Sequence, residues 1–365
     1  MKNNPKFVIS GGGTGGHIFP AIAIADALKR RFPEADILFI GAKGRMEMER
    51  VPKAGYPIEG LWISGFTKDL RALILPLKLT SSVNHAIAIL KRFKPDVVIG
   101  VGGFASGPTL MGANYLHIPT VIQEQNSYPG KTNRRVGQRA KAICVAYDHM
   151  EQWFPADRIH LTGNPLRANI AATAPRDEAA SNFGLNPEKP IVLLVGGSQG
   201  ALGINTGISA QLNKFKDNDL QLIWQTGKTY IAQAQAEVKA LGVDDKVKPT
   251  VFIDRMDLAY SAADVVISRA GAIAISELSL VQKPVIFVPL PTAAEDHQTK
   301  NAQRLVDAEA ALMVKNAETE QELIPTLFKL LNEPATQAKM RENIGKFARP
   351  NAAEDIVEQI IKVIE

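Results

Sequence analysis

Short runs of Val and Ile alternate with helix-like segments along the whole chain, and this alternation restricts the fold more than any other feature. Strands buried on both faces read as continuous apolar runs, and parallel strands must be joined by crossover segments, usually helices. The pattern therefore predicts an α/β chain with parallel sheets covered by helices on both faces. The expected strands are 6–10, 36–40, 96–100, 119–123 and 141–146 in the first half, and 191–195, 220–225, 247–253, 264–267 and 285–288 in the second.

The strands fall into two sets, and 365 residues are too many for one ordinary core. The segment between the sets is rich in proline and poor in large apolar residues, as linkers are. We therefore predict one domain over 1–164, a second over 165–346, and a C-terminal helix within 347–365. The sequence leaves open which domain this helix packs on, and packing back on the N-terminal domain is our working hypothesis.

The charge distribution favours an anionic partner for the first half. Residues 1–164 contain 21 Lys and Arg against 12 Asp and Glu, a net charge of +9, whereas the whole chain carries only +5. No zinc-finger spacing, RNP-type aromatic motif or Lys/Arg tract is present, which argues against nucleic acid. One cysteine, Cys144, cannot form an internal disulfide. With no signal-peptide pattern and no spanning stretch of about 18 apolar residues, we expect a cytoplasmic protein.

A glycine loop follows the first expected strand. Gly11, Gly13 and Gly16 satisfy the dinucleotide fingerprint, but the second strand ends in Gly41-Ala42-Lys43, without the carboxylate that NAD requires. NADP stays open as an alternative. The loop holds more glycines than the fingerprint needs, so we expect its N–H groups to bind an anion or to let a substrate approach closely. A merely tight turn is the less favoured explanation.

Two polar positions in the first half suggest chemistry. His17 lies at the entry to a helix, where the dipole favours the neutral imidazole that a general base requires. A capping or packing histidine is an equally weighted alternative, and His297 is a second, lower-ranked candidate base. Glu124 and Asn126 follow the strand 119–123, at the edge where parallel sheets place their ligands. We expect these two residues to bind a sugar or to orient a catalytic group.

The second half repeats the arrangement of strand, glycine turn and helix. The turn Gly196–Gly200 contains Ser198, whose hydroxyl is suited to phosphate or ribose. Gly271 opens a helix whose first N–H groups form a site for a diphosphate. Glu277 lies near two helical turns further on, within reach of ribose hydroxyls, and Gln298 can both donate to and accept from a sugar.

The segment 65–94 mixes aliphatic and basic residues. Taken alone, it reads as a core helix with a solvated basic face. Because it belongs to the basic half of the chain, we favour a segment that lies on an anionic membrane without spanning it.

Seven motifs in order carry a family resemblance: GGGTGGHIFPAIAIADAL, VIGVGGFASGP, EQNSYPG, LTGNPLR, LVGGSQGA, RAGAIAISE and DHQTKNA. Across nearly its whole length the chain resembles the MurG family of UDP-N-acetylglucosamine transferases of peptidoglycan synthesis. The resemblance implies a GT-B fold of two Rossmann-like domains facing a cleft, with the donor in the C-terminal domain and the lipid acceptor on the N-terminal domain. Phe104 departs from the tyrosine of some relatives, so no role requiring a hydroxyl there is inferred.

The resemblance also implies the site. His17 matches the residue usually proposed as the base, and we keep Glu124, from its place at the strand end, as a second catalytic candidate. The substrate-binding positions would be Thr14, Gly15, Gly16, Asn126, Arg167, Ser198, Ile253, Ala272, Ile273, Ala274, Ile275, Ser276, Glu277 and Gln298. Ile253 would offer its backbone to the uracil edge.

The activity implied is an inverting transfer from UDP-GlcNAc to the C4 hydroxyl of MurNAc in undecaprenyl-pyrophosphoryl-MurNAc-pentapeptide, which converts lipid I to lipid II. No cofactor is required, no metal cluster is evident, and metal stimulation stays open. The expected location is the cytoplasmic face of the bacterial inner membrane, near other cell-wall synthesis proteins, with consequences for cell shape and division. The alternatives are sugar transfer to a diacylglycerol lipid, an NADP-dependent oxidoreductase, and a non-catalytic nucleotide-sugar-binding subunit.

Overall fold

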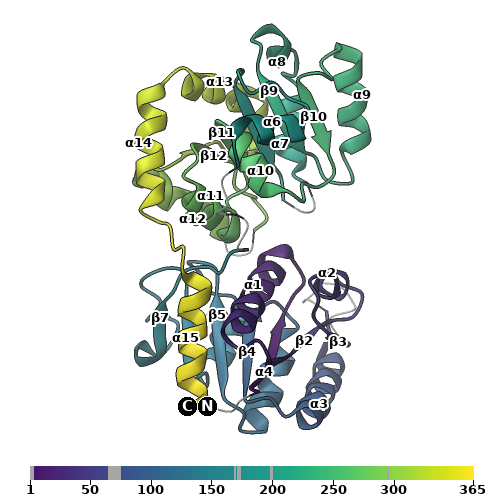
Figure 1. Ribbon diagram of the computed structural model, residues 1–365, viewed down its shortest axis with the longest axis vertical. Coiled ribbons are helices and arrows are strands. Elements are labelled where there is room, and N and C mark those ends of the chain that lie inside the picture. The colour runs from purple at the N-terminus through teal and green to yellow at the C-terminus, as the bar shows by residue number, and fades with distance from the viewer. Residues whose placement is uncertain (1–3, 65–74, 168–169, 171–173, 198–199, 294–295) are drawn as a thin grey trace. The chain divides into compact units, whose positions relative to one another are not determined.

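The computed structural model describes residues 4–64, 75–167, 170, 174–197, 200–293 and 296–365. The chain divides into two compact units (Figure 1). The first comprises Met1–Arg167 together with Asn351–Glu365, and the second comprises Ala168–Pro350. The second unit is thus inserted, in sequence, before the last helix of the first.

The described part of the first unit contains a seven-stranded parallel sheet in the order β3-β2-β1-β4-β5-β6-β7. Its strands are β1 Lys6–Gly11, β2 Asp36–Ala42, β3 Ile58–Leu61, β4 Val97–Gly102, β5 Thr120–Glu124, β6 Ala142–Val145 and β7 Ile159–Leu161. Its helices are α1 Gly15–Arg31, α2 Glu47–Lys53, α3 Leu75–Phe93, α4 Ser106–Tyr115, α5 Lys131–Gly137 and α15 Ala352–Ile364.

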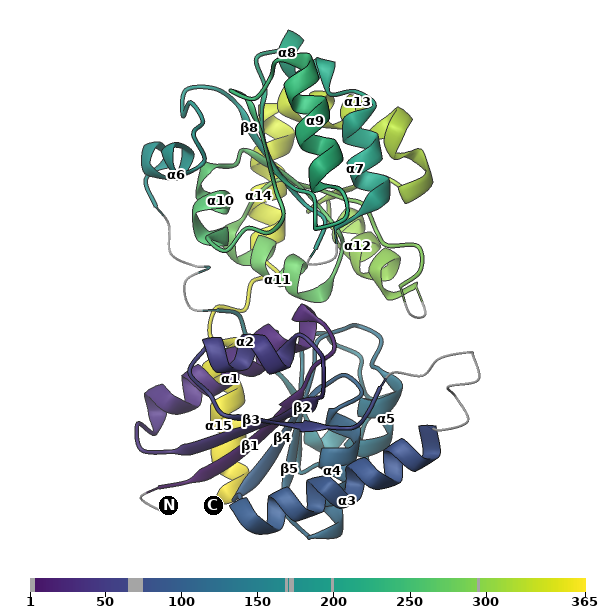
Figure 2. The ribbon, with the colours of Figure 1, turned by 90° about the vertical axis from the view of Figure 1, so that its right-hand side faces the viewer.

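Successive residues of each strand point to opposite faces of this sheet, as the period of two requires. Phe7 and Ile9 belong to one core with α1, α2 and α15. Val8 and Ile40 belong to a second core with α3, α4 and α5. Figure 2 shows the two groups of helices on opposite sides of the strands. Burial on both faces explains why these strands are continuous apolar runs.

Helix α15 is an integral part of the first unit. Ile356 and Ile360 are fully buried in the core that contains α1, at 0% exposure. A surface ion pair between Arg30 and Glu354, 2.7 Å apart, lies at the same contact. The apolar residues of α15, which recur at helical spacing on one face, therefore pack the C-terminal helix onto the first unit.

The second unit has a six-stranded parallel sheet among its described residues, in the order β10-β9-β8-β11-β12-β13. Its strands are β8 Ile191–Val195, β9 Gln221–Gln225, β10 Val247–Thr250, β11 Val265–Ser268, β12 Val285–Phe287 and β13 Leu312–Met313. Its helices are α6 Arg176–Asn182, α7 Leu202–Ser209, α8 Asn213–Asp217, α9 Ile231–Leu241, α10 Met256–Ala262, α11 Ala272–Val281, α12 His297–Asp307, α13 Thr319–Leu331 and α14 Pro334–Gly345. Helices α6, α10, α11 and α12 cover one face, and α7, α8, α9 and α13 the other.

The predicted α/β class with two doubly wound sheets is confirmed. Every predicted strand is present, although β10 ends at Thr250 and is shorter than expected. The prediction missed β3, β7 and β13, which are all edge strands. An edge strand is short and has a neighbour on one side only, so it lacks a long apolar run. Within the described part of the chain, no helix has the length and apolar character to cross a membrane.

Candidate functional site

The site begins at the point in each sheet where the strand order reverses. In the first unit this switch point lies between β1 and β4, and in the second between β8 and β11. Ligands of doubly wound sheets bind outside the carboxyl ends of the strands at such points. The glycine loop 11–16 follows β1, the turn 196–200 follows β8, and α11 begins after β11. The sequence motifs therefore stand where the topology provides room for ligands.

The first glycine loop packs directly against the turn that follows β4. A β-carbon on Gly103 would lie 2.2 Å from the carbonyl oxygen of Gly12, and one on Gly13 would lie 2.9 Å from the Phe104 ring. One on Gly11 would lie 3.2 Å from Cβ of Val101. Close packing against backbone thus requires glycine at 103, and it leaves little room for a side chain at 11 or 13, irrespective of any ligand. The tight-turn explanation that the sequence disfavoured accounts for this part of the loop.

A buried carboxylate that the sequence did not suggest supports the same loop. Glu47, on α2, is 1% exposed and accepts hydrogen bonds from Gly13 N and Ala42 N, both at 3.0 Å. The Gly13 N–H is therefore engaged within the protein. The exposed part of the loop, Thr14 and Gly16 at the start of α1, is what faces solvent.

His17 lies in the first turn of α1 with its imidazole oriented on both sides. Its Nδ1 is 3.2 Å from Oγ1 of Thr14. On the other side, a β-carbon on Gly102 would lie 3.0 Å from Nε2 of His17. When Nδ1–H donates to Thr14, Nε2 carries the lone pair that a general base needs. The bond to Thr14 is compatible with the base role and with the capping role, so both stay predictions.

Glu124 is 2% exposed at the end of β5, and both its oxygens are hydrogen-bonded. Oε1 accepts from N (3.0 Å) and Nδ2 (3.3 Å) of Asn126, and Oε2 accepts from Gly130 N (3.2 Å) and Nδ2 of Asn133 (2.9 Å). Burial raises the pKa of this carboxyl, although the four bonds act in the opposite direction. The geometry makes Glu124 a buttress for the loop that presents Asn126, and direct contact with substrate stays a prediction.

The neighbouring polar residues of the EQN motif have a different role. Gln125 donates from Nε2 to Val101 O at 2.7 Å, and Gln123 donates to Oδ1 of Asn164 at 3.0 Å. Asn164, from the TGNP motif, returns a bond to Gln125 O at 3.2 Å. All three side chains are buried, and their bonds join β4, β5 and the segment after β7.

Asn133 is a second residue that the sequence did not suggest. It is 2% exposed, comes from α5, and bonds to Glu124. The position of a β-carbon on Gly102 would be 3.5 Å from its Nδ2 and 3.0 Å from Nε2 of His17. His17, Asn133 and Glu124 therefore form one polar cluster at the carboxyl ends of β1, β4 and β5. Arg167 stands apart from it, with its guanidinium 4.8 Å from the Phe19 ring centre on α1.

In the second unit, α11 begins without a side-chain cap. Its N-cap is Gly271, with φ −70° and ψ 145°, and the first paired amide is Ile275 N, which donates to Gly271 O at 3.0 Å. The N–H groups of Ala272, Ile273 and Ala274 therefore have no acceptor within the helix. Ile275 is buried and its N–H is used, so the earlier amides are the ones suited to a diphosphate. Ser276 donates from Oγ to Ala272 O at 3.0 Å, within the helix.

Neighbouring residues orient two further side chains that the sequence predicts to bind substrate, Glu277 and Gln298. Tyr260, on α10, donates to Oε2 of Glu277 at 2.9 Å, which orients the half-buried carboxylate. Leu290 N donates to Oε1 of Gln298 at 2.9 Å, so the amide NH2 of Gln298 is the half suited to donate to a sugar.

The contact between the Ile253 backbone and the uracil edge stays a prediction, and the structure shows how half of that backbone is used. Its N–H donates to Oε1 of Gln225 at 2.9 Å, so the carbonyl is the part of its backbone left for the predicted contact with uracil. Gln225, which the sequence did not suggest, also donates from Nε2 to Gly197 O at 3.1 Å. Ser198 lies outside the described residues, as do residues 65–74 of the basic segment.

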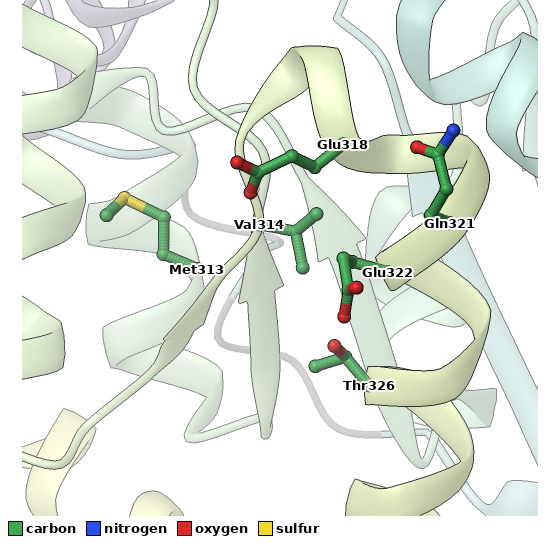
Figure 3. Close-up of a pocket in the computed structure, with 6 residues that line it drawn as sticks. All are labelled: Met313, Val314, Glu318, Gln321, Glu322 and Thr326. Atoms are coloured by element: carbon green, nitrogen blue, oxygen red, sulfur yellow. The ribbon is translucent and has the colours of Figure 1, made fainter.

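One hollow of about 540 Å³ lies at the outer edge of the second sheet, away from the switch point (Figure 3). Its polar lining includes the carboxylates of Glu318, directly before α13, and of Glu322, in the first turn of α13. Two carboxylates repel a diphosphate, so we do not assign the donor here. Among the described residues, no three His, Cys, Asp or Glu side chains are grouped so that they could hold a metal ion.

Comparisons with known proteins agree with this division of the chain. Residues 7–145 match the glycosyltransferase family 28 N-terminal domain, and residues 191–360 match its C-terminal domain. Proteins of Flavobacterium psychrophilum and Parabacteroides distasonis are each 50% identical to the chain, over 99% of it and 98% of their own length. Both are named UDP-N-acetylglucosamine–N-acetylmuramyl-(pentapeptide) pyrophosphoryl-undecaprenol N-acetylglucosamine transferase. The crystal structure of Acinetobacter baumannii MurG is similar with a TM-score of 0.76 and 29% identity, over 98% of this chain and 99% of that one.

Proposed function

The chain belongs to glycosyltransferase family 28, and on this premise we propose that it transfers N-acetylglucosamine from UDP-N-acetylglucosamine to the lipid-linked muramyl pentapeptide, converting lipid I to lipid II. The observation that carries the proposal is the 50% identity to named transferases over practically the full length of both chains. The two switch-point sites supply the physical reason, because one offers a base and the other an anion-binding helix end.

In the donor half of the reaction, the uncapped amides of α11 bind the diphosphate. They lie at the positive end of the helix dipole and stabilise the charge that develops on the leaving UDP. Glu277, oriented by Tyr260, accepts hydrogen bonds from the ribose hydroxyls, and the NH2 group of Gln298 donates to the sugar.

In the acceptor half, Nε2 of His17 removes the proton from the attacking C4 hydroxyl of MurNAc. Thr14 fixes the imidazole through Nδ1. Glu124 holds the loop that carries Asn126 and, through Asn133, the wall beside the imidazole. Attack on the face opposite the leaving UDP inverts the anomeric carbon and gives the β-1,4 link.

The start of α3 is the part of the first unit that we assign to an anionic lipid surface. Ala86, Ile89 and Leu90 of this helix are buried, whereas Leu77 is 69% exposed. Trp62, 53% exposed, lies beneath the Lys78 ammonium, 5.5 Å from the ring centre. Exposed aliphatic and aromatic groups beside a cation are suited to the interface of anionic membranes.

Release of UDP from UDP-N-acetylglucosamine, measured with and without the lipid-linked muramyl acceptor, tests the function. We expect acceptor-dependent release in the wild type. His17→Ala should lose most of this turnover while its affinity for UDP, measured calorimetrically, stays within about twofold. Stabilisation of the protein by NADPH and not by UDP would refute the transferase proposal and favour the oxidoreductase alternative.

Binding to sedimented vesicles of anionic phosphatidylglycerol, compared with zwitterionic phosphatidylcholine, tests the lipid surface. Leu77→Glu should reduce binding to the anionic vesicles without changing UDP affinity. Equal binding of this variant and the wild type would remove the start of α3 from the proposal.

A further inference from the structure

Gln225 is the last residue of β9 and one of the few buried polar side chains near the second switch point. It is 2% exposed, and its amide spans two backbone segments that are distant in sequence. Oε1 accepts from Ile253 N at 2.9 Å, and Nε2 donates to Gly197 O at 3.1 Å. Because one backbone partner is a donor and the other an acceptor, the orientation of the amide is defined by its partners.

The two segments that Gln225 joins follow the two strands that flank β9. Gly197 belongs to the turn after β8, which is closed by Gly200 N donating to Gly197 O at 3.1 Å. Ile253 lies in the segment after β10. The sequence predicts that the turn meets the phosphate or ribose of the donor, and the family resemblance implies that Ile253 meets the uracil edge. On these expectations, one buried amide joins two elements that contact different parts of one nucleotide.

We propose that Gln225 is a positioning residue for the donor nucleotide, which acts by holding the turn after β8 and the segment around Ile253 at a fixed separation. The inference rests on the proposed function. It also narrows one expected contact: with its N–H held by Gln225, Ile253 meets the pyrimidine edge through its carbonyl, which accepts from N3–H of uracil. When the two segments are already held in place, less entropy is lost in ordering them on binding, so the expected effect is on the affinity for the nucleotide.

Gln221 provides a matched control at the opposite end of the same strand. It is also 2% exposed, and its amide also bonds to backbone: Oε1 accepts from Asn186 N and Nε2 donates to Asn186 O, both at 2.7 Å, with a longer bond from Nε2 to Lys189 O at 3.5 Å. It lies at the amino end of β9, away from the switch point. Replacement of either glutamine by methionine keeps the side-chain length and removes the hydrogen bonds of its amide to backbone. The two variants therefore make the same chemical change at opposite ends of β9.

The experiment compares Gln225→Met and Gln221→Met in the full-length protein by thermal unfolding, UDP calorimetry and steady-state turnover. We expect both variants to lower the melting temperature of the second unit by similar amounts. Gln225→Met should weaken UDP binding and raise KM for the donor by about 10-fold to 100-fold, since a buried N–H loses its acceptor at the site. Turnover at saturating donor should stay within about threefold. Gln221→Met should bind UDP within about twofold of the wild type.

Gln225→Glu tests the inference if Gln225→Met does not fold. It retains an acceptor for Ile253 N and places a carboxylate oxygen against Gly197 O, so it should also weaken UDP binding. UDP affinity within twofold of wild type in the folded Gln225 variants, with the same loss of stability as Gln221→Met, would overturn the inference alone. Failure of the wild type to bind UDP would overturn the proposed function and the inference with it.

Discussion

Gly103→Ala is the sharpest test of the packing between the two glycine turns of the first unit. Gly103 has φ +80°, and a β-carbon added to it would lie 2.2 Å from the carbonyl oxygen of Gly12 and 3.1 Å from its carbonyl carbon. The obstacle is backbone, so it cannot rotate away as a flexible side chain can. The substitution must therefore displace the loop that leads into His17, or distort the turn after β4.

Gly55→Ala is the matched control for the backbone conformation. Gly55 has φ +89° in the same unit, and a β-carbon there would meet nothing within 4 Å. A left-handed conformation costs a non-glycine residue about 1–2 kcal/mol. The stiffer unfolded chain offsets about 0.4–1 kcal/mol of this cost. We therefore expect Gly55→Ala to lower the free energy of unfolding by about 1 kcal/mol.

Gly103→Ala carries the same conformational cost and adds a steric one. Forcing extra volume into a packed site costs about 1–3 kcal/mol, so this variant should be less stable than Gly55→Ala by that amount. In a unit of this size, each kcal/mol lowers the melting temperature by about 2–4 °C. Calorimetric scans of the two variants measure the difference.

Activity provides an independent readout of the same displacement. A shift of about 1 Å at a catalytic group can reduce the rate about 100-fold. We expect Gly103→Ala to lose about 10-fold or more in turnover, with UDP affinity retained because the UDP contacts proposed above, at α11 and Glu277, lie in the other unit. Gly55→Ala should keep its turnover. If Gly103→Ala proves as stable and as active as Gly55→Ala, the packing argument is refuted.

Three further substitutions test separate parts of the structure. Glu124→Gln replaces one acceptor oxygen by an NH2 group that faces N–H donors, so it should cost about 1–3 kcal/mol in denaturant unfolding and reduce turnover more than UDP affinity; unchanged turnover would contradict the buttress role. Ile360→Ala empties part of the core between α15 and α1, and calorimetry should show the first unit alone losing about 2–5 kcal/mol. Burial lowers the pKa of Lys283 to about 8 from its usual 10.5. Between pH 8 and 10.5 the folded state binds fewer protons than the unfolded state, so the free energy of unfolding falls as the pH falls through this range. Above pH 10.5 Lys283 is neutral in both states, and this loss is absent. The free energy of unfolding of the wild type relative to Lys283→Met should therefore rise across this range, and a flat difference would contradict it.

The interior of both sheets could be predicted because its strands are buried on both faces and carry an unbroken apolar signal. The segments Ile58–Leu61, Ile159–Leu161 and Leu312–Met313 carry no such signal, because each pairs on one side only at an edge of its sheet. The glycine turns could also be located from the sequence, because each one interrupts the apolar pattern at the end of a strand.

The supporting side chains of the site could not be predicted in this way. Glu47 contacts a loop 34 residues before it, and Gln225 contacts a backbone amide 28 residues after it. Such pairings depend on strand order, which a single sequence does not display. Gln225 did leave a weak signal, since a polar residue follows the apolar run Leu222–Trp224 at the carboxyl end of the strand. Asn133 left none, because an asparagine in a polar helix is ordinary.

The return of α15 to the first unit has a consequence for biosynthesis. Domains usually fold in order as the chain leaves the ribosome. Here the second unit is synthesised completely before the first has received its last helix, and until then the apolar residues of α1 that α15 covers lack their partner. The nascent chain therefore holds an unfinished N-terminal unit while a later one is already able to fold. A premature stop near residue 350 would leave the second unit intact and the first uncovered, so quality control by chaperones and proteases should recognise the N-terminal part of the truncated protein.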